Sequence, residues 1–177
     1  PTHNTTIAAG IGLILAFGDG EPGAQVYAAA ASKDQAQQAY RPAKLLAEGT
    51  PSFKRAGIKA GVKQIMRARD QSFMMAIASV GDLIQGTNPN GAIVDELHVH
   101  KSADVIDALE SGTGARSQPL VIIITTADGG DDLTVYATRR KEIEDLCKGT
   151  ISSASKYGVV FGARKDDDPF AEETWAK

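Results

Sequence analysis

The chain has 177 residues, 42% of them hydrophobic, and a formal net charge of −3 at pH 7, which suits one domain with a full core and excludes an overall basic field for nucleic acid. Its single cysteine, Cys147, excludes an internal disulfide framework and fits a reducing cytoplasm. The longest apolar stretch, 7–17, is too short to cross a bilayer, so we expect no membrane segment.

The first third of the chain reads as a helix, a strand and a second helix. An apolar run over 5–17, followed by a glycine-rich stop signal, predicts a helix that is apolar on nearly all sides and buried against a sheet. A short strand is expected at 25–30. Ser32 with Gln35 three residues later is a capping box, which predicts a helix that runs to about Gly49.

Proline and turn-forming residues shape the next part of the chain. Pro42 predicts a kink or a break in the second helix, because proline removes a backbone hydrogen bond and collides with the preceding turn. Two extended segments, 58–68 and 72–78, flank a turn at Asp70-Gln71. This arrangement predicts a hairpin or a strand excursion at the edge of the sheet.

Two short runs of β-branched residues without polar alternation predict strands that are buried on both faces, as in a parallel sheet. One run leads into Asp95 and Glu96, and the other ends in Thr125 and Thr126. Ligands of open α/β sheets bind beyond the carboxyl ends of the strands. We therefore expect these four side chains to share one crevice.

The remaining pattern completes an α/β fold. A helix with polar residues near its start is predicted at 102–109, between the two buried strands, and a further helical pattern covers 133–148. From Lys165 onward the chain is acidic and polar, which is typical of an exit from a domain. Alternating strands and helices predict a mostly parallel sheet with helices on both faces.

The acidic pair at the end of a strand suits hydrolysis of a nucleotide. In this interpretation the carboxylate of Asp95 holds Mg²⁺ directly or through water, and Glu96 polarises the attacking water. The alternative is that the two acids only cap the helical segment that follows them. The residue pattern alone leaves both interpretations open.

A set of segments along the chain shares its order and spacing with one protein family. The segments are Thr5-Thr6-Ile7-Ala8-Ala9-Gly10, Gly18-Asp19-Gly20-Glu21-Pro22-Gly23-Ala24 with Val26-Tyr27, Gly86-Thr87-Asn88-Pro89, Ala92-Ile93-Val94-Asp95-Glu96-Leu97-His98, Ala115-Arg116-Ser117-Gln118-Pro119-Leu120, Ile124-Thr125-Thr126-Ala127, and Asp168-Pro169-Phe170 to Trp175. Each segment is a weak signal alone, but the ordered set is specific. It resembles the ATPase domain of the large subunit of tailed-bacteriophage terminases, the motor that packages DNA into procapsids.

The resemblance implies a P-loop NTPase-like fold in which hydrolysis of ATP, with Mg²⁺, drives the translocation of viral DNA. Asp95 matches the Walker B aspartate that organises Mg²⁺, and Glu96 matches the glutamate that activates water. Thr125 and Thr126 match the motif that couples nucleotide state to movement, although hydrogen bonding at a strand end is the simpler role. Arg116, in another matching segment, either senses a phosphate, positions a neighbouring subunit, or is a solvated surface residue.

The N-terminus departs from the phosphate-binding pattern G-x-x-x-x-G-K-[ST]. Thr5 matches the Mg²⁺-binding hydroxyl and Thr6 follows it, but Asn4 stands where lysine is expected and His3 where glycine is expected. Asparagine can donate a hydrogen bond to a phosphate, yet it does not neutralise the charge that builds during transfer, and the expected cost is on the order of several kcal/mol. We expect a fold that is incomplete at its N-terminal edge, either a truncated ATPase or a remnant that folds or associates without hydrolysis.

The resemblance also sets expectations for domains and partners. Residues 1–164 would form the ATPase domain, and 165–177 the start of a linker towards the family's nuclease domain. Double-stranded viral DNA, the terminase small subunit and the portal protein are the implied partners, and a homo-oligomeric ring is the implied assembly. The implied location is the cytoplasm of an infected or prophage-carrying bacterial cell.

Two further patterns have both a functional and a structural interpretation. His98 and His100 follow the acidic strand two residues apart, and they either bind a metal with Asp95 or Glu96 or form a polar pair at the strand end. Positive charge also concentrates in 54–70, where the alternatives are contact with DNA phosphates and a solvated face. The positive residues are Lys54, Arg55, Lys59, Lys63, Arg67 and Arg69, and Asp70 is the one acid among them.

Overall fold

The computed structural model describes residues 3–83, 87–126, 133–161, 168 and 171. The chain divides into two compact units, 1–126 and 127–177, and each is described by itself. The domain boundary predicted at 164 falls outside the described residues. No helix within the described ranges is long and apolar enough to cross a membrane.

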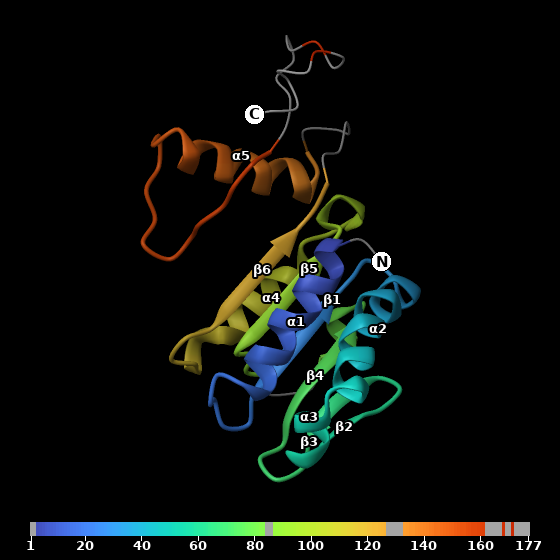
Figure 1. Ribbon diagram of the computed structural model, residues 1–177. Coiled ribbons are helices and arrows are strands. Elements are labelled where there is room, and N and C mark those ends of the chain that lie inside the picture. The colour runs from blue at the N-terminus through green and yellow to red at the C-terminus, as the bar shows by residue number, and fades with distance from the viewer. Residues whose placement is uncertain (1–2, 84–86, 127–132, 162–167, 169–170, 172–177) are drawn as a thin grey trace. The chain divides into compact units, whose positions relative to one another are not determined.

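The first unit alternates helices and strands, and the described residues of the second contain one helix (Figure 1). In chain order the elements of the first unit are α1 (His3–Phe17), β1 (Gln25–Ala29), α2 (Lys33–Gly49), α3 (Pro51–Arg55), β2 (Ile58–Ala60), β3 (Gln64–Arg67), β4 (Ser72–Ile77), β5 (Gly91–Asp95), α4 (Asp104–Gly112) and β6 (Leu120–Ile124), with short 3-10 turns at Val80–Asp82, Leu97–Val99 and Thr113–Ala115. The second unit holds α5 (Val135–Cys147). The helices predicted at 102–109 and 133–148 correspond to α4 and α5.

One mixed, six-stranded sheet forms the centre of the first unit, in the order β2-β3-β4-β1-β5-β6. β1 pairs in parallel with β4 and β5, and β5 pairs in parallel with β6, whereas β2 and β3 are antiparallel to their neighbours. Figure 1 shows α1 and α2 on one face of the sheet and α4 on the other. The predicted α/β fold with a mostly parallel sheet is therefore confirmed.

The segment 58–78 forms a hairpin whose second strand lies inside the sheet. β3 and β4 pair across a turn in which Gln71 has a positive φ of 59°. The first predicted extended segment is divided into β2 and β3, because the chain turns at Gly61, whose N–H donates to the carbonyl of Gln64 at 2.8 Å. β2 occupies the sheet edge, so the excursion at the edge is limited to the first half of the segment.

The helix α1 is less buried than its composition predicts. Ala8, Leu13 and Ala16 pack into the core, but Ile7 and Ile14 are 62% and 60% exposed. α1 lies against one face of the sheet and against α2, and the side that carries Ile7 and Ile14 is exposed. The predicted helix against the sheet is therefore confirmed, although two of its apolar side chains remain exposed.

The helix α2 continues through Pro42, so the predicted break does not occur. Its N-terminus is capped as predicted, because Ser32 Oγ accepts a hydrogen bond from the N–H of Gln35 at 3.3 Å. Tyr40 is buried, and its hydroxyl donates to the carbonyl of Gly61 at 3.1 Å. Burial raises the pKa of Tyr40 to about 12, so this hydroxyl stays protonated and ties α2 to the turn after β2.

Close packing sets the direction of α1 relative to β5. A Cβ at Gly91, the first residue of β5, would lie 2.9 Å from Leu15 Cδ1, so the last turn of α1 rests directly on the start of β5. At the other end, Thr5 in the first turn of α1 is bonded to Asp95, the last residue of β5. α1 therefore runs antiparallel to β5 and places its N-terminus at the carboxyl end of the sheet.

Candidate functional site

The predicted site residues meet where β1, β5 and β6 end. Thr5 Oγ1 donates a hydrogen bond to Asp95 Oδ2 at 3.1 Å, between residues 90 positions apart in the chain. This contact follows from the antiparallel arrangement of α1 and β5. The structure therefore brings a hydroxyl and a carboxylate together from the two segments that the sequence assigned to a magnesium ion.

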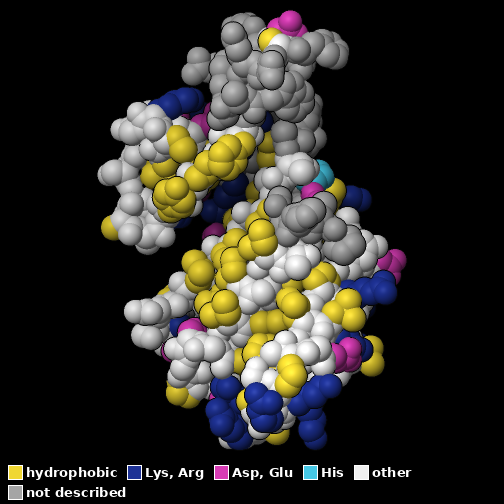
Figure 2. Space-filling model, viewed as in Figure 1, with side chains coloured by type: hydrophobic (Ala, Val, Ile, Leu, Met, Phe, Trp, Pro, Cys, Tyr) yellow, Lys and Arg dark blue, Asp and Glu magenta, His cyan; other side chains and the backbone are white. Residues whose placement is uncertain are grey.

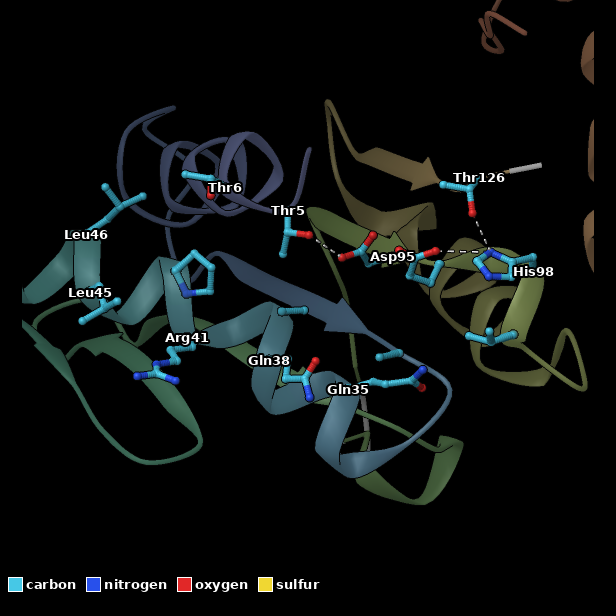
Figure 3. A pocket seen from close by; sticks show the side chains of 15 residues that line it. Thr5, Thr6, Gln35, Gln38, Arg41, Leu45, Leu46, Asp95, His98 and Thr126 are labelled. Carbon is cyan, nitrogen blue, oxygen red and sulfur yellow. Dashed lines mark hydrogen bonds and ion pairs between the residues drawn. The ribbon is translucent and has the colours of Figure 1, made fainter. Parts of the chain in front are cut away.

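A cavity of about 1340 Å³ opens beside this contact. Figure 3 shows the start of α1 and the acidic end of β5 on its walls, with α2 along the side. The lining side chains include Thr5, Thr6, Gln35, Gln38, Arg41, Asp95, Glu96, His98 and Thr126. Small-molecule sites in proteins usually occupy roughly 300–1,000 Å³, so this space is large enough for a nucleotide.

The oxygen atoms of Asp95 and Thr5 fit a hard divalent cation. Within the described residues, the carboxylate of Asp95 accepts one side-chain hydrogen bond, the bond from Thr5, although an ionised carboxylate can accept about four. Magnesium is usually bound through one or two protein oxygens, with water and phosphate completing an octahedron. The two side chains supply that number of ligands, and the open cavity leaves space for the rest.

Glu96 turns the chain out of β5 with an unusual backbone conformation. Its φ and ψ are 55° and 53°, in the left-handed region, which costs a residue with a side chain roughly 1 kcal/mol or more. Such conformations are concentrated at functional sites, where the surrounding fold holds them in place. Glu96 Oε2 lies 3.2 Å from Nδ1 of His98, so its carboxylate is held at the wall of the cavity.

His98 connects the end of β5 to the end of β6. Its backbone N–H donates to Thr125 Oγ1 at 3.2 Å, and its Nδ1 lies 3.1 Å from the same oxygen. Nδ1 also lies 3.5 Å from Thr126 Oγ1, a contact that Figure 3 marks. One imidazole thus contacts both threonines and the carboxylate of Glu96.

The two histidines have separate roles, and they do not form the metal pair considered from the sequence. His100 is 8% exposed, and its Nε2 has no hydrogen-bond partner among the described residues. Burial lowers the pKa of His100 below its usual value of 6.5, so the ring is neutral at pH 7. No group of three or more His, Cys, Asp or Glu side chains suited to a metal occurs in the part of the chain that is described.

Arg116 lies at the opposite end of the sheet from the cavity, so it does not contact a ligand there. Its guanidinium donates to the carbonyls of Asn88 and Gly23 at 2.8 Å each, and it pairs with Glu21 at 2.8 Å. These segments precede β5 and β1, and Arg116 itself precedes β6, so the contacts surround the amino ends of the strands. Arg116 does not line the cavity and is not a solvated residue, because it fastens three connecting segments together. Its role in positioning a neighbouring subunit stays a prediction.

The first turn of α1 faces the cavity through Thr5 and Thr6. The free backbone N–H groups of a helix N-terminus attract phosphate, which suits this position for an anionic ligand. Asn4 lies in the same turn, but its side chain is outside those that the structure describes. The prediction that Asn4 contacts phosphate therefore stays a prediction.

Sequence analysis did not identify the wall that α2 contributes to the cavity. Gln35, Gln38 and Arg41 are spaced three residues apart and follow the Ser32 cap, so one side of α2 borders the cavity with polar groups. Residues three and four apart share a face of a helix. The spacing was visible in the sequence, but it became informative only when the fold placed α2 opposite Asp95.

Comparisons with known proteins bear on the family and the fold of this chain. The family model for the ATPase domain of terminase large subunits matches residues 2–151. Protein YmfN of Escherichia coli (strain K12) is 35% identical over 83 residues, which cover 47% of this chain and 18% of YmfN. The crystal structure of the HK97 bacteriophage large terminase is similar with a TM-score of 0.78 at 26% identity, covering 97% of this chain and 36% of that one. This chain therefore spans well under half the length of either protein.

Proposed function

The chain belongs to the family of terminase large subunit ATPase domains, and from this we propose that it binds ATP with Mg²⁺ in the cavity beside Asp95 and hydrolyses it to move double-stranded viral DNA. The observation that carries the proposal is the 3.1 Å contact between Thr5 and Asp95. It joins the hydroxyl and the carboxylate that a P-loop ATPase uses for its metal, at the helix N-terminus where phosphate would bind.

Each side chain then has a distinct task. Thr5 and Asp95 hold Mg²⁺, and the cation offsets the negative charge of the phosphates when it is bound. The N–H groups of the first turn of α1 bind the phosphate oxygens, with Asn4 and Thr6 beside them. Glu96 orients the attacking water and accepts its proton, because its carboxylate lies on the cavity wall and next to the metal ligand Asp95.

The link from Glu96 through His98 to Thr125 and Thr126 supports a coupling role for the two threonines. A change in the position of Glu96 would alter the contacts of His98. The Nδ1 atom of His98 lies 3.1 Å from Thr125 Oγ1 and 3.5 Å from Thr126 Oγ1, at the end of β6. We assign to this chain of contacts the transmission of nucleotide state from the cavity to the rest of the motor.

A second candidate function rests on Asn4. Without a lysine at this position the transferred phosphate lacks a charged contact, which is expected to slow hydrolysis by several kcal/mol of lost transition-state stabilisation. In that case the chain is a catalytically impaired remnant, one that folds or associates with motor subunits without hydrolysing ATP.

The intact motor extends the proposal beyond this chain. Its partners would be double-stranded viral DNA, the terminase small subunit and the portal protein, and its assembly would be a homo-oligomeric ring. These functions belong to the cytoplasm of an infected or prophage-carrying bacterial cell. The family match supports these proposals, and the residues described here would form only one part of such a motor.

Magnesium-dependent ATP binding and turnover, measured on this chain and on Glu96→Ala, test the proposal. We expect Glu96→Ala to keep ATP binding and to lose turnover by about 10²–10⁴-fold, as is usual when a general base is removed. Glu48→Ala is the matched control, because Glu48 is an exposed carboxylate on α2 outside the cavity lining. Binding without any turnover in the unmodified chain would favour the remnant, and no binding at all would contradict the proposed ATPase function of this chain.

A further inference from the structure

One short segment has a net positive charge, whereas the whole chain has a net negative charge. Residues 54–70 contain six lysines and arginines and one acid, Asp70, whereas the whole chain has a net charge of −3. The positive residues are contributed by α3, by β2 and β3, and by the turns on either side of β3. This concentration is unrelated to the cavity and to the residues that line it.

One of the six cations is used inside the fold together with the single acid. Arg67 Nε lies 3.0 Å from both carboxylate oxygens of Asp70, and another nitrogen of its guanidinium donates to the carbonyl of Phe17 at 3.1 Å. The guanidinium also stacks over the ring of Phe17 at 5.7 Å. The Arg67 guanidinium, with a further hydrogen bond from Ser72, holds the pKa of Asp70 well below its usual range, so this acid is already paired within the fold.

The other five cations are left exposed and unneutralised. We call Lys54, Arg55, Lys59, Lys63 and Arg69 the basic surface, since all five are exposed and none forms an ion pair within the described ranges. Other cations differ, because Arg140 pairs with Glu144 at 2.8 Å and Lys148 with the same carboxylate at 3.6 Å. A surface whose cations lack local partners has charge available for a ligand.

The basic surface occupies one edge of the sheet. Figure 2 shows dark blue side chains gathered at the end of the first unit where Figure 1 places α3 and β3. Arg69 follows β3 at the level where β4 begins, and Lys63 precedes β3 at the level where β4 ends. The surface therefore extends along β2 and β3, and β2 alone, with its three residues, spans about 10 Å.

The chemistry of this surface suits a polyphosphate backbone better than a protein partner. Protein–protein interfaces are depleted in lysine and centred on apolar groups, whereas nucleic-acid interfaces are strongly positive. Double-stranded DNA advances about 3.4 Å per base pair, so a row of cations about 10 Å long faces several successive phosphates. Arginine and lysine contacts to phosphate fix position without reading sequence.

We propose that the basic surface binds the phosphates of double-stranded DNA without sequence preference. The identity of the polyanion rests on the proposed function, in which duplex DNA is the transported substrate. Rigid support for the surface comes from Arg67, because its bonds to Asp70 and Phe17 fix the turn that carries Arg69 to the end of α1. DNA would lie along the β2 edge, so the cavity beside Asp95 stays open to nucleotide.

Fluorescence anisotropy with a labelled 30-base-pair duplex of arbitrary sequence tests the proposal on the full chain, without nucleotide. The test variant is Lys54→Gln/Lys59→Gln/Lys63→Gln. The matched control is Lys101→Gln/Lys141→Gln/Lys148→Gln, which removes three other exposed lysines and the same net charge. We expect the test variant to bind the duplex at least about tenfold more weakly at 100 mM KCl, while the control stays within about twofold.

The dependence on salt gives a second readout. Each phosphate contact contributes about 0.9 to the slope of log affinity against log salt, so the test variant should lose up to about 2.7 from that slope. Equal weakening in the two triple variants, or no duplex binding by the unmodified chain at 50 mM KCl, overturns the proposal. Should the test variant unfold, Arg55→Gln/Arg69→Gln replaces it. Failure here leaves ATP binding untouched, so it is distinguishable from failure of the proposed function.

Discussion

The charged side chains at the two ends of the parallel strands differ in how many partners they have. At the amino ends, the side chain of Arg116 is 9% exposed and bonded to Glu21, to carbonyls of the same connecting segment, and to the carbonyl of Asn88 in another. At the carboxyl ends, Asp95 and Glu96 are adjacent acids, and within the described residues each carboxylate contacts one polar side chain, that of Thr5 or of His98. One end has its charge neutralised, and the other has spare bonding capacity beside a cavity.

This contrast separates structural from functional charge better than exposure alone. A buried ion that is fully bonded contributes to stability through its partners, and its removal leaves those buried partners without hydrogen bonds. An acid with few partners adds little to stability, and natural proteins tolerate such groups where activity needs them. We therefore expect substitutions at the amino ends to lower stability and leave ligand binding unchanged, and substitutions at the carboxyl ends to weaken ligand binding with little effect on stability.

The largest effect on stability is expected for Arg116→Ala. Removing this guanidinium leaves Glu21 without this ion-pair partner and three backbone carbonyls without this donor, at a cost of about 3 kcal/mol in the free energy of unfolding. Urea denaturation followed by circular dichroism measures the loss. ATP binding at temperatures where the variant is folded should be unchanged, since Arg116 lies away from the cavity.

Arg55→Ala is the control for that substitution, because Arg55 is exposed and its loss should change stability by less than about 0.5 kcal/mol. A stable Arg116→Ala protein that has lost ATP binding would reverse the assignment of the two ends. Such a result would support the interpretation of Arg116 as a phosphate sensor.

Asp95→Asn should show the reverse pattern. The amide keeps the size of the side chain and can still accept the hydrogen bond from Thr5, while it removes one of two adjacent negative charges. We expect the free energy of unfolding to change by less than about 1 kcal/mol, and magnesium-dependent ATP binding to weaken by tenfold or more. Isothermal titration of ATP with and without Mg²⁺ measures the second effect, and a loss confined to the magnesium-free titration would contradict it.

Local patterns predicted the framework of this end of the fold. The β-branched strand before Asp95, the Ser32 cap and the threonines after β6 were identified because each signal lies within a few neighbouring residues. The crevice predicted for Asp95, Glu96, Thr125 and Thr126 followed from a general property of parallel sheets. Thr5 entered the predicted site only through the family resemblance, and its 3.1 Å contact with Asp95 depends on the direction of α1.

The errors concern contacts between distant segments. Composition did not indicate which side of α1 the sheet would cover, and the side that carries Ile7 and Ile14 is exposed. Arg116 is bonded to Glu21, more than ninety positions away, so its neighbours in sequence gave no sign of burial. Similarly, His98 was grouped with His100 by spacing, although the fold directs it to Glu96 and Thr125.

The smallest predicted effect is a pH dependence that His100 brings to the carboxyl end of the sheet. Burial lowers the pKa of His100 below its usual value of 6.5, so below about pH 6.5 the unfolded chain binds a proton that the folded chain resists. Stability contributed by the neutral ring is therefore complete above that pH and is lost as the pH falls towards the lower pKa of the folded state. The maximum slope is about 1.4 kcal/mol for each unit of pH.

Urea denaturation at pH 7.5 and 5.5 isolates this effect, because Asp70 and Asp82, whose partners lower their pKa values, stay ionised across that range. We expect His100→Gln to reduce the loss of stability between the two pH values, since glutamine does not titrate. His98→Gln is the matched control, because His98 is bonded at the surface of the cavity and its contacts with Glu96 do not require burial. If both variants changed the pH dependence equally, the effect would belong to the histidine pair as a local charge and not to the buried ring.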